Sequence, residues 1–273
     1  MNLEAPVSVI IPCWRCAGSI GQAVASVAAQ TRRPYEVILI DDASGDGTLE
    51  TLYQLASQYP ADWIKVIARE SNGGPGLARN TGWAAAASLY IAFLDSDDAW
   101  FPEKIARQTA WMEAHPEAIL SAHQTILWRL GDPIPAVPDM LPACRINLLK
   151  MLWFNRFPTR TVMIRRDIAL RFGQLSHSED YLLWLEIVAS GAPCYLIQAV
   201  MACCFRPEFS PGGYSGQLWR HERCELVAFA SLWAKGGLGF ATWIIVSAWS
   251  LIKFLRRAAI MLPARRRKTK NGP

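Results

Sequence analysis

The first hundred residues alternate short apolar runs, rich in β-branched side chains, with segments of helical periodicity. The apolar runs cover residues 7–11, 36–40, 64–68 and 90–94. Runs of this kind, separated by helical segments, are typical of parallel strands that are buried on both faces of a sheet. The pattern predicts an α/β fold with a Rossmann-like, mostly parallel sheet and helices on both faces.

Helices are predicted between and after these strands, at residues 20–30, 49–59, 75–87 and 102–115. The first is expected to begin with a capping box formed by Ser19 and Gln22. Residues 118–235 are less regular, and we expect them to shape the site of the second substrate. Ligands of open parallel sheets bind at the carboxyl ends of the strands, so the residues that follow the strands are the functional candidates.

The net charge of +5 is concentrated at the C-terminal end of the chain. From Lys253 onward there are eight basic residues and no acidic one, which leaves 20 basic and 23 acidic residues elsewhere. Because a nucleic-acid-binding protein normally carries a basic face on its body, no nucleic-acid partner is expected. A basic tail beside an apolar segment indicates an anionic membrane surface instead.

Residues 238–262 are mostly apolar and precede a basic cluster at residues 265–268. The polar residues of this stretch share one helical face, at spacings of three and four: Ser247, Ser250, Lys253 and Arg257. The stretch approaches the roughly 20 residues of a membrane span, but charges interrupt it. This pattern favours a helix that lies in the membrane interface. A single span and a helix packed on the domain remain alternatives.

The seven cysteines have no framework spacing, and the first residues lack the pattern of a signal peptide. A reducing, cytosolic compartment is therefore expected. Cys13 and Cys16 form a C-x-x-C that could be a redox motif or half of a zinc site. No second such pair and no paired histidines accompany it, so two small residues in a turn are the favoured interpretation.

Asp95, Asp97 and Asp98 follow the fourth predicted strand directly. Carboxylates crowded at a strand end repel one another unless a cation neutralises them. Mg²⁺ or Mn²⁺ would do so, since hard cations take carboxylate oxygens and share their other positions with water and phosphates. A solvated acidic turn or a helix cap is the alternative.

The second predicted strand brings Asp41 and Asp42 to the same edge of the sheet. Such a carboxylate could accept hydrogen bonds from a nucleotide base, or it could cap the turn at residues 43–47. Trp14 follows the first strand and could stack on a base or pack in the core. Arg79 could bind a phosphate through its planar fork or take part in an ion pair.

Glu179 and Asp180 precede an apolar helix at residues 181–189. Acidic residues stabilise a helix start, but one of the two could instead face the cleft as a general base. The glycine-containing turns at residues 45–47 and 74–76 lack the register of a dinucleotide fingerprint, and the chain has no P-loop motif.

Five segments, taken together and in this order, resemble the family-2 glycosyltransferases with the GT-A fold. They are VSVIIPCW, EVILIDDASGDGT, NGGPGLARNTG, YIAFLDSDDAWFPEKI and HSEDYLLWLEI. The resemblance covers roughly residues 6–210. It implies a metal-dependent transfer, with Mg²⁺ or Mn²⁺, of a sugar from a nucleotide diphosphate, with inversion at the anomeric carbon.

The resemblance also implies roles for individual residues. Trp14 and Asp42 would contact the base, Arg79 and Asn80 the diphosphate, Asp95 the ribose or metal, Asp97 the metal, and Asp180 would be the base. Further residues expected to bind substrate are Pro12, Asp41, Ser96, Glu179 and Trp184.

The sequence departs from the family pattern at two places. Arg15 stands where the family usually has Asn, which puts the local turn in doubt. Arg206 is followed by Pro207 and Glu208, whereas many members have Arg-x-His. Either Glu208 supplies an oxygen ligand there, or that contact is absent.

The resulting hypothesis is an inverting glycosyltransferase at the cytoplasmic face of a membrane, acting on a glycan or lipid-linked acceptor. Residues 1–100 would bind the nucleotide sugar, residues 101–235 the acceptor, and residues 236–273 the membrane. A sugar-phosphate nucleotidyltransferase is an alternative, although residues 12–15 are not the Gly-rich, basic loop it needs. An inactive nucleotide-sugar-binding module is another.

Overall fold

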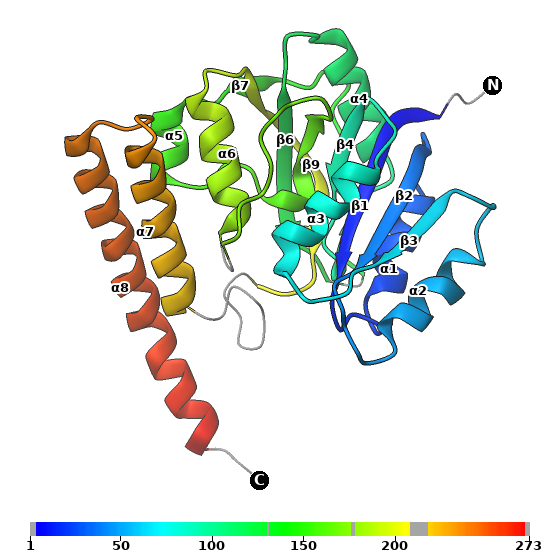
Figure 1. Ribbon diagram of the computed structural model, residues 1–273, viewed down its shortest axis with the longest axis horizontal. Helices are drawn as coiled ribbons and strands as arrows, with labels where there is room; N and C mark the ends of the chain where they lie inside the picture. The colour runs from blue at the N-terminus through cyan, green and yellow to red at the C-terminus, as the bar shows by residue number, and fades with distance from the viewer. Residues whose placement is uncertain (1–3, 130, 176–177, 208–217, 271–273) are drawn as a thin grey trace.

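A single nine-stranded sheet runs through the chain, in the order β3-β2-β1-β4-β8-β6-β9-β5, with β7 paired to β9 (Figure 1). The structure is a computed structural model that describes residues 4–129, 131–175, 178–207 and 218–270. The sheet includes strands from both the predicted nucleotide-binding part and the part after residue 100. The two parts therefore share one hydrogen-bonded framework.

Four parallel strands form the N-terminal half of the sheet, as the sequence predicts. They are β1 (Ala5–Cys13), β2 (Pro34–Asp41), β3 (Ile64–Ala68) and β4 (Tyr90–Phe93). The residues of β1, β2 and β4 are almost all buried, because helices cover both faces of this half, whereas the edge strand β3 is partly exposed. The carboxyl ends of β1, β2 and β4 meet at one edge, where Asp42 and Asp95 follow their strands.

Successive residues of β1 point to opposite faces and enter two different cores. Val9 and Ile11 pack with α1, α2 and α4, whereas Ile10 packs with α3 and α6. The bounds of these helices are α1 (Ile20–Ala28), α2 (Thr48–Ala56), α3 (Gly74–Ala85), α4 (Lys104–Ala114) and α6 (Glu179–Ala189). The predicted two-sided covering of the sheet is confirmed.

The predicted capping box at the start of α1 is wrong. Ser19 stands at the cap position, but its hydroxyl donates to the carbonyl of Cys16 at 3.3 Å and accepts no helix N–H. With φ −117° and ψ −30°, Ser19 lies outside the extended conformation that directs a capping side chain to the helix.

The region after residue 118 is more regular than its sequence suggests. It supplies β6 (Leu120–Leu127), β7 (Ala143–Arg145), β8 (Met163–Arg165) and β9 (Cys194–Cys204), after the short β5 (Asp98–Trp100). Two short helices, α5 (Leu148–Trp153) and the 3₁₀ helix η1 (Thr159–Thr161), lie between these strands. Strands as short as β8 give no clear sequence pattern, and β8 is held only because β4 and β6 pair with its two edges.

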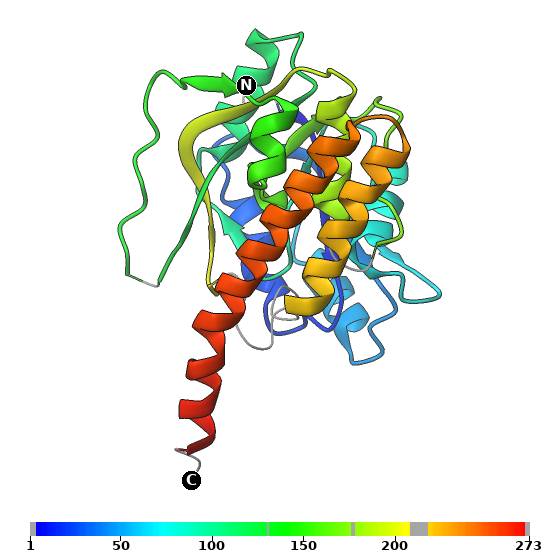
Figure 2. The ribbon, with the colours of Figure 1, turned by 90° about the vertical axis from the view of Figure 1, so that its left-hand side faces the viewer.

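The C-terminal part is a helical hairpin of α7 (Leu218–Ala234) and α8 (Phe240–Lys270). Figure 2 shows α8 lying across the outside of the body between α5 and α7, with its last turns extending beyond it. Ser250 is completely buried, and Lys253 and Arg257 pair with glutamates of α7. The first half of α8 thus packs on the domain. Within the described residues, no helix combines the length and apolar character needed to cross a bilayer.

His123 gives a test of the central sheet through pH. It is completely buried in β6, with Nδ1 2.9 Å from the carbonyl oxygen of Gln124, and burial lowers its pKa to about 3. The unfolded chain takes up this proton near the ordinary pKa of about 6.5, so the native state loses stability as the pH falls below that value. This group contributes a slope of up to about 1.4 kcal/mol per pH unit.

The His123→Gln variant should therefore show a shallower dependence of the unfolding free energy on pH between about 6.5 and 4.5. Urea denaturation of both proteins at a series of pH values measures the two slopes. Parallel slopes would mean that His123 is protonated inside the folded protein.

Candidate active site

The three aspartates after β4 lie in a tight turn, in which the backbone N–H of Asp98 donates to the carbonyl of Asp95 at 3.1 Å. Arginines neutralise two of them. Asp95 pairs with Arg79 at 2.7 Å, and Asp98 pairs with Arg160 at 3.0 Å. Asp97 has no ion pair with any residue that the structure describes. Burial, followed by the charge of Asp95, raises the pKa of Asp97, as expected for a carboxylate that lacks a cation.

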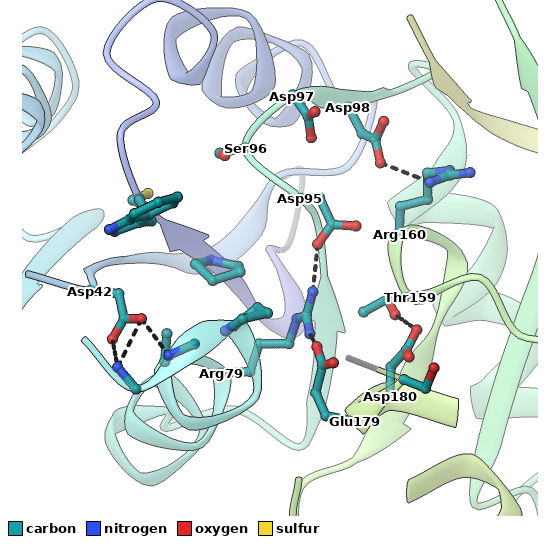
Figure 3. A pocket seen from close by; sticks show the side chains of 18 of the residues that line it. Asp42, Arg79, Asp95, Ser96, Asp97, Asp98, Thr159, Arg160, Glu179 and Asp180 are labelled. Carbon is teal, nitrogen blue, oxygen red and sulfur yellow. Dashed lines mark hydrogen bonds and ion pairs between the residues drawn. The ribbon is translucent and has the colours of Figure 1, made fainter. Parts of the chain in front are cut away.

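These aspartates line a cavity of about 790 Å³ at the carboxyl ends of the strands (Figure 3). A volume of this size fits a small-molecule ligand. The predicted site residues that line it are Pro12, Trp14, Asp42, Arg79, Asp95, Ser96, Asp97, Glu179 and Asp180. Residues from β1, β4, α3 and α6 therefore converge on one space.

Arg79 joins the two halves of this site. Its guanidinium is buried, with Nη2 on Asp95 and Nη1 on Glu179 at 2.9 Å. Burial opposes the charged form, but the two carboxylates hold the pKa of Arg79 above its ordinary value. The sequence left open whether Arg79 binds a phosphate or takes part in an ion pair, and the structure shows the ion pairs. Gly76 permits the close approach of α3 to α6, because a Cβ there would lie 2.8 Å from Cγ of Glu179.

Glu179 and Asp180 differ in their surroundings. Glu179 is buried and bound to Arg79, and burial followed by the charge of Asp180 raises its pKa to about 7. Asp180 is partly exposed and accepts a hydrogen bond from the hydroxyl of Thr159 at 2.6 Å. Of the two carboxylates, Asp180 is thus the one that a substrate in the cavity can reach without breaking a buried ion pair.

The adjacent carboxylates Asp41 and Asp42 are both used within the protein. Asp41 accepts hydrogen bonds from the backbone N–H and hydroxyl of Ser44, which is the predicted turn-capping role. It does not line the cavity. Asp42 does line the cavity, but its carboxylate accepts the N–H groups of Gly73 and Gly74 and pairs with Arg69. Asp42 therefore shapes the turn that leads into α3.

Trp14 lies open at the cavity, with 52% of its surface exposed. The core-packing alternative is therefore excluded for this residue. Arg15 beside it has a φ of 50°, in the left-handed region that Asn tolerates better than most residues. The turn is thus retained despite the departure from the family pattern. Its guanidinium lies 4.9 Å from the Trp14 ring centroid, and its N–H donates to Ser44.

Besides Asp41, two predicted substrate residues do not line the cavity. The side-chain amide of Asn80 is hydrogen-bonded to the backbone of Phe172. Its Nδ2 donates to the carbonyl at 2.8 Å, and its Oδ1 accepts from the N–H at 3.0 Å. Trp184 is completely buried and packs against Phe93 and Phe172, with ring centroids 6.1 and 5.7 Å away. Asn80 thus holds α3 to the loop at Phe172, and Trp184 holds α6 to β4, so we correct both assignments to packing roles away from the cavity.

Other cavity residues have no counterpart among the sequence predictions. Thr159 and Arg160 come from η1, and Arg220 and His221 come from the first turn of α7. None lies in a recognisable motif, so the sequence carries no signal for them. His221 brings an imidazole to the cavity, which Arg206 and Pro207 also line. Glu208, the predicted substitute, lies outside the described residues.

The buried arginine bridge can be tested by stability. Arg79→Met leaves Glu179 buried without its partner, and removing one member of a buried ion pair costs about 3–5 kcal/mol. The double variant Arg79→Met/Glu179→Gln should recover part of this loss, because no buried charge is left unpaired. Urea denaturation measures both. A single variant as stable as the wild type would show that the bridge contributes nothing to the fold.

Comparison with known proteins identifies the family of this chain. Residues 8–128 match the family model described as Glycosyl transferase family 2. The glycosyltransferase EpsE of Bacillus subtilis is 36% identical over 212 residues, which cover 74% of this chain and 73% of EpsE. WfaP of Escherichia coli, a UDP-Glc:alpha-D-GlcNAc-diphosphoundecaprenol beta-1,3-glucosyltransferase, is 31% identical over 189 residues, covering 68% of this chain and 71% of WfaP.

Solved structures show the same fold. TarS of S. aureus superposes with a TM-score of 0.64 at 22% identity, over 91% of this chain and 71% of that one. The mannosyltransferase PcManGT of Pyrobaculum calidifontis, in complex with GDP-Man and Mn²⁺, superposes with a TM-score of 0.65 at 18% identity. The match covers 94% of this chain and 76% of PcManGT. The expected GT-A fold is thereby confirmed, and the nucleotidyltransferase alternative is set aside. The chain belongs to glycosyltransferase family 2.

Proposed function

We propose that this glycosyltransferase transfers a sugar from a nucleotide diphosphate to a hydroxyl of a lipid-linked glycan, with inversion at the anomeric carbon. The observation that carries the proposal is that one cavity is lined by an exposed aromatic ring, Trp14, an unpaired carboxylate, Asp97, and a reachable carboxylate, Asp180. These are the three groups needed for base recognition, leaving-group stabilisation and proton removal.

The donor would lie along the β1 side of the cavity. An exposed indole can stack on a nucleotide base, with a contribution of about 1–3 kcal/mol by analogy with base stacking on aromatic side chains. Arg15 lies against the ring and adds positive charge beside it. Because the carboxylate of Asp42 is already used by the turn before α3, any contact of Asp42 with the base requires it to share those hydrogen bonds.

The residues present fit a divalent cation held by Asp97, with Asp95 beside it. Among the described residues there is no cluster of three or more ligands. That agrees with Mg²⁺-type sites, which use one or two carboxylates and complete their shell with water and substrate phosphates. When bound, such a cation neutralises the charge of the departing nucleotide diphosphate. Arg79 and Arg160 neutralise the two neighbouring aspartates and leave Asp97 to the cation.

Inversion in one step requires the acceptor hydroxyl to attack from the side opposite the nucleotide, so a base must lie on that side. We assign this role to Asp180. Thr159 holds one of its oxygens at 2.6 Å, and the backbone N–H of Tyr181 holds the other at 2.7 Å. Asp97 is unsuited to this role for two reasons. A metal-bound carboxylate is a weak base, and Asp97 would lie on the nucleotide side of the sugar.

The acceptor class is proposed from the relatives. WfaP and WfgD of Escherichia coli are described as acting on GlcNAc linked to diphosphoundecaprenol. A lipid-linked acceptor places the reaction at a membrane, and we propose the cytoplasmic face, with the protein bound peripherally. This agrees with the basic C-terminal tail.

The metal assignment predicts that Asp97→Asn abolishes turnover, because it removes the one aspartate of the turn after β4 that pairs with no described arginine. Transfer measured as release of the nucleotide diphosphate, with added Mn²⁺, checks this. Glu70→Gln, which changes an exposed carboxylate outside the cavity, is the matched control and should be fully active. Full wild-type activity in EDTA would refute the metal requirement.

The base assignment predicts that Asp180→Asn retains donor affinity and lowers kcat by about 10²–10⁴, the usual contribution of a positioned base. Isothermal titration with the nucleotide diphosphate and steady-state kinetics separate the two effects. Normal turnover of this variant combined with an inactive, stably folded Glu179→Gln would move the role to Glu179. Activity in both would place the base elsewhere.

A further inference from the structure

Helix α8 presents an apolar face to the outside of the protein. Its exposed residues fall on one side of the helix and are apolar except for one: Phe240, Ala241, Ile244, Ile245, Ala248, Leu251, Ile252, Leu255, Arg256 and Ala259. The large side chains are strongly exposed, with 61% for Phe240, 56% for Ile252 and 64% for Leu255. A continuous exposed apolar surface of this kind marks an interaction site.

The charged face of α8 is turned inward instead. Lys253 donates to Glu225 at 2.7 Å, and Arg257 donates to Glu222 at 3.4 Å, where both glutamates are buried in the contact with α7. Ser250, about one helical turn before Lys253, is completely buried. Because these buried ion pairs fix the rotation of α8, the helix cannot turn its apolar face toward its own domain.

The neighbouring helix α5 extends this surface. Helix α5 lies beside α8 (Figure 2), and Leu149 and Trp153 of α5 are exposed, as is Phe154 just beyond its end. Trp249 of α8 connects the two helices, because its ring lies 5.3 Å from that of Trp153 and 6.3 Å from that of Phe154. Tryptophan and phenylalanine at such a position are typical of surfaces that enter the lipid headgroup region.

The distribution of charge in the chain indicates what binds to the apolar face of α8. After Lys253 there are only basic charged residues, including the cluster at residues 265–268, and α8 carries its backbone beyond the body in that direction (Figure 1). An anionic bilayer satisfies both the apolar face and this cluster. A second copy of the chain would cover the apolar face but would offer little negative charge, since the rest of the chain has 23 acidic and 20 basic residues.

We propose that the outward face of α8, together with the exposed end of α5, docks on an anionic lipid bilayer. The docking serves the lipid-linked acceptor and so rests on the proposed function. It differs from a simple amphipathic tail, because the polar residues Ser250, Lys253 and Arg257 stay inside the α7–α8 contact. Since α7 begins with Arg220 and His221 at the cavity, docking through this hairpin holds the cavity at a fixed orientation to the lipid.

The full-length chain is tested by flotation with vesicles of phosphatidylcholine containing phosphatidylglycerol. The triple variant Ile245→Gln/Ile252→Gln/Leu255→Gln should bind at least about tenfold more weakly, because it removes apolar surface that enters the headgroup region. The matched control, Leu89→Gln/Leu127→Gln/Ile134→Gln, changes exposed apolar residues away from α8 and should float like the wild type. Replacing Arg265, Arg266, Arg267 and Lys268 by Gln should weaken flotation only with anionic vesicles.

Equal flotation of the wild type and the α8 triple variant would overturn the proposal. A wild type that fails to float and sediments as a dimer without lipid, while the triple variant is monomeric, would identify the face as a contact between copies and would also overturn it. Release of the nucleotide diphosphate with a water-soluble acceptor is measured in parallel. If the wild type floats normally but releases no nucleotide diphosphate, the proposed function is refuted and the docking surface is still supported.

Discussion

The contact of Arg79 with Asp95 and Glu179 is the interaction on which the rest of the site depends. It connects the end of β4 to the start of α6, two elements that are far apart in the sequence. A buried guanidinium is tolerable only with its charge compensated, and a buried Glu179 only with its partner in place. The bridge therefore holds Asp97 and Asp180 on the walls of one cavity, although neither residue takes part in it.

The electrostatics of the acidic turn follow from the same principle. Three aspartates at one strand end would repel each other, and the protein resolves this with one arginine for each outer member, Arg79 for Asp95 and Arg160 for Asp98. The central carboxylate, Asp97, has a raised pKa and no ion pair with a described arginine, although the more distant charges of Arg206 and Arg160 partly oppose that rise. This arrangement supports the divalent cation that we propose for Asp97.

The α7–α8 hairpin applies a related constraint at the surface. The ion pairs of Lys253 and Arg257 lie inside the hairpin, whereas the exposed residues that the structure describes in α8 are apolar except for Arg256, the reverse of a helix that packs on a water-soluble domain. The first turn of α7 also lines the cavity. The hairpin that presents the apolar face therefore also reaches the cavity, so the position of the surface and the position of the cavity are coupled through α7 and α8.

The sequence by itself determined the parallel half of the sheet, its two-sided covering and the acidic residues at its edge, because the period of the apolar pattern and the residues after each strand are local properties. It also determined the family through motifs in a set order.

Only the tertiary structure decided which motif residues reach the cavity. Asn80 and Trp184 lie within the motifs, but Asn80 is hydrogen-bonded to the backbone of Phe172 and Trp184 packs against its ring. Thr159 and His221 line the cavity although their segments contain no motif. The orientation of α8 was also beyond the sequence, since its periodic polar face is equally suited to water and to the glutamates of α7, and only long-range ion pairs choose between them.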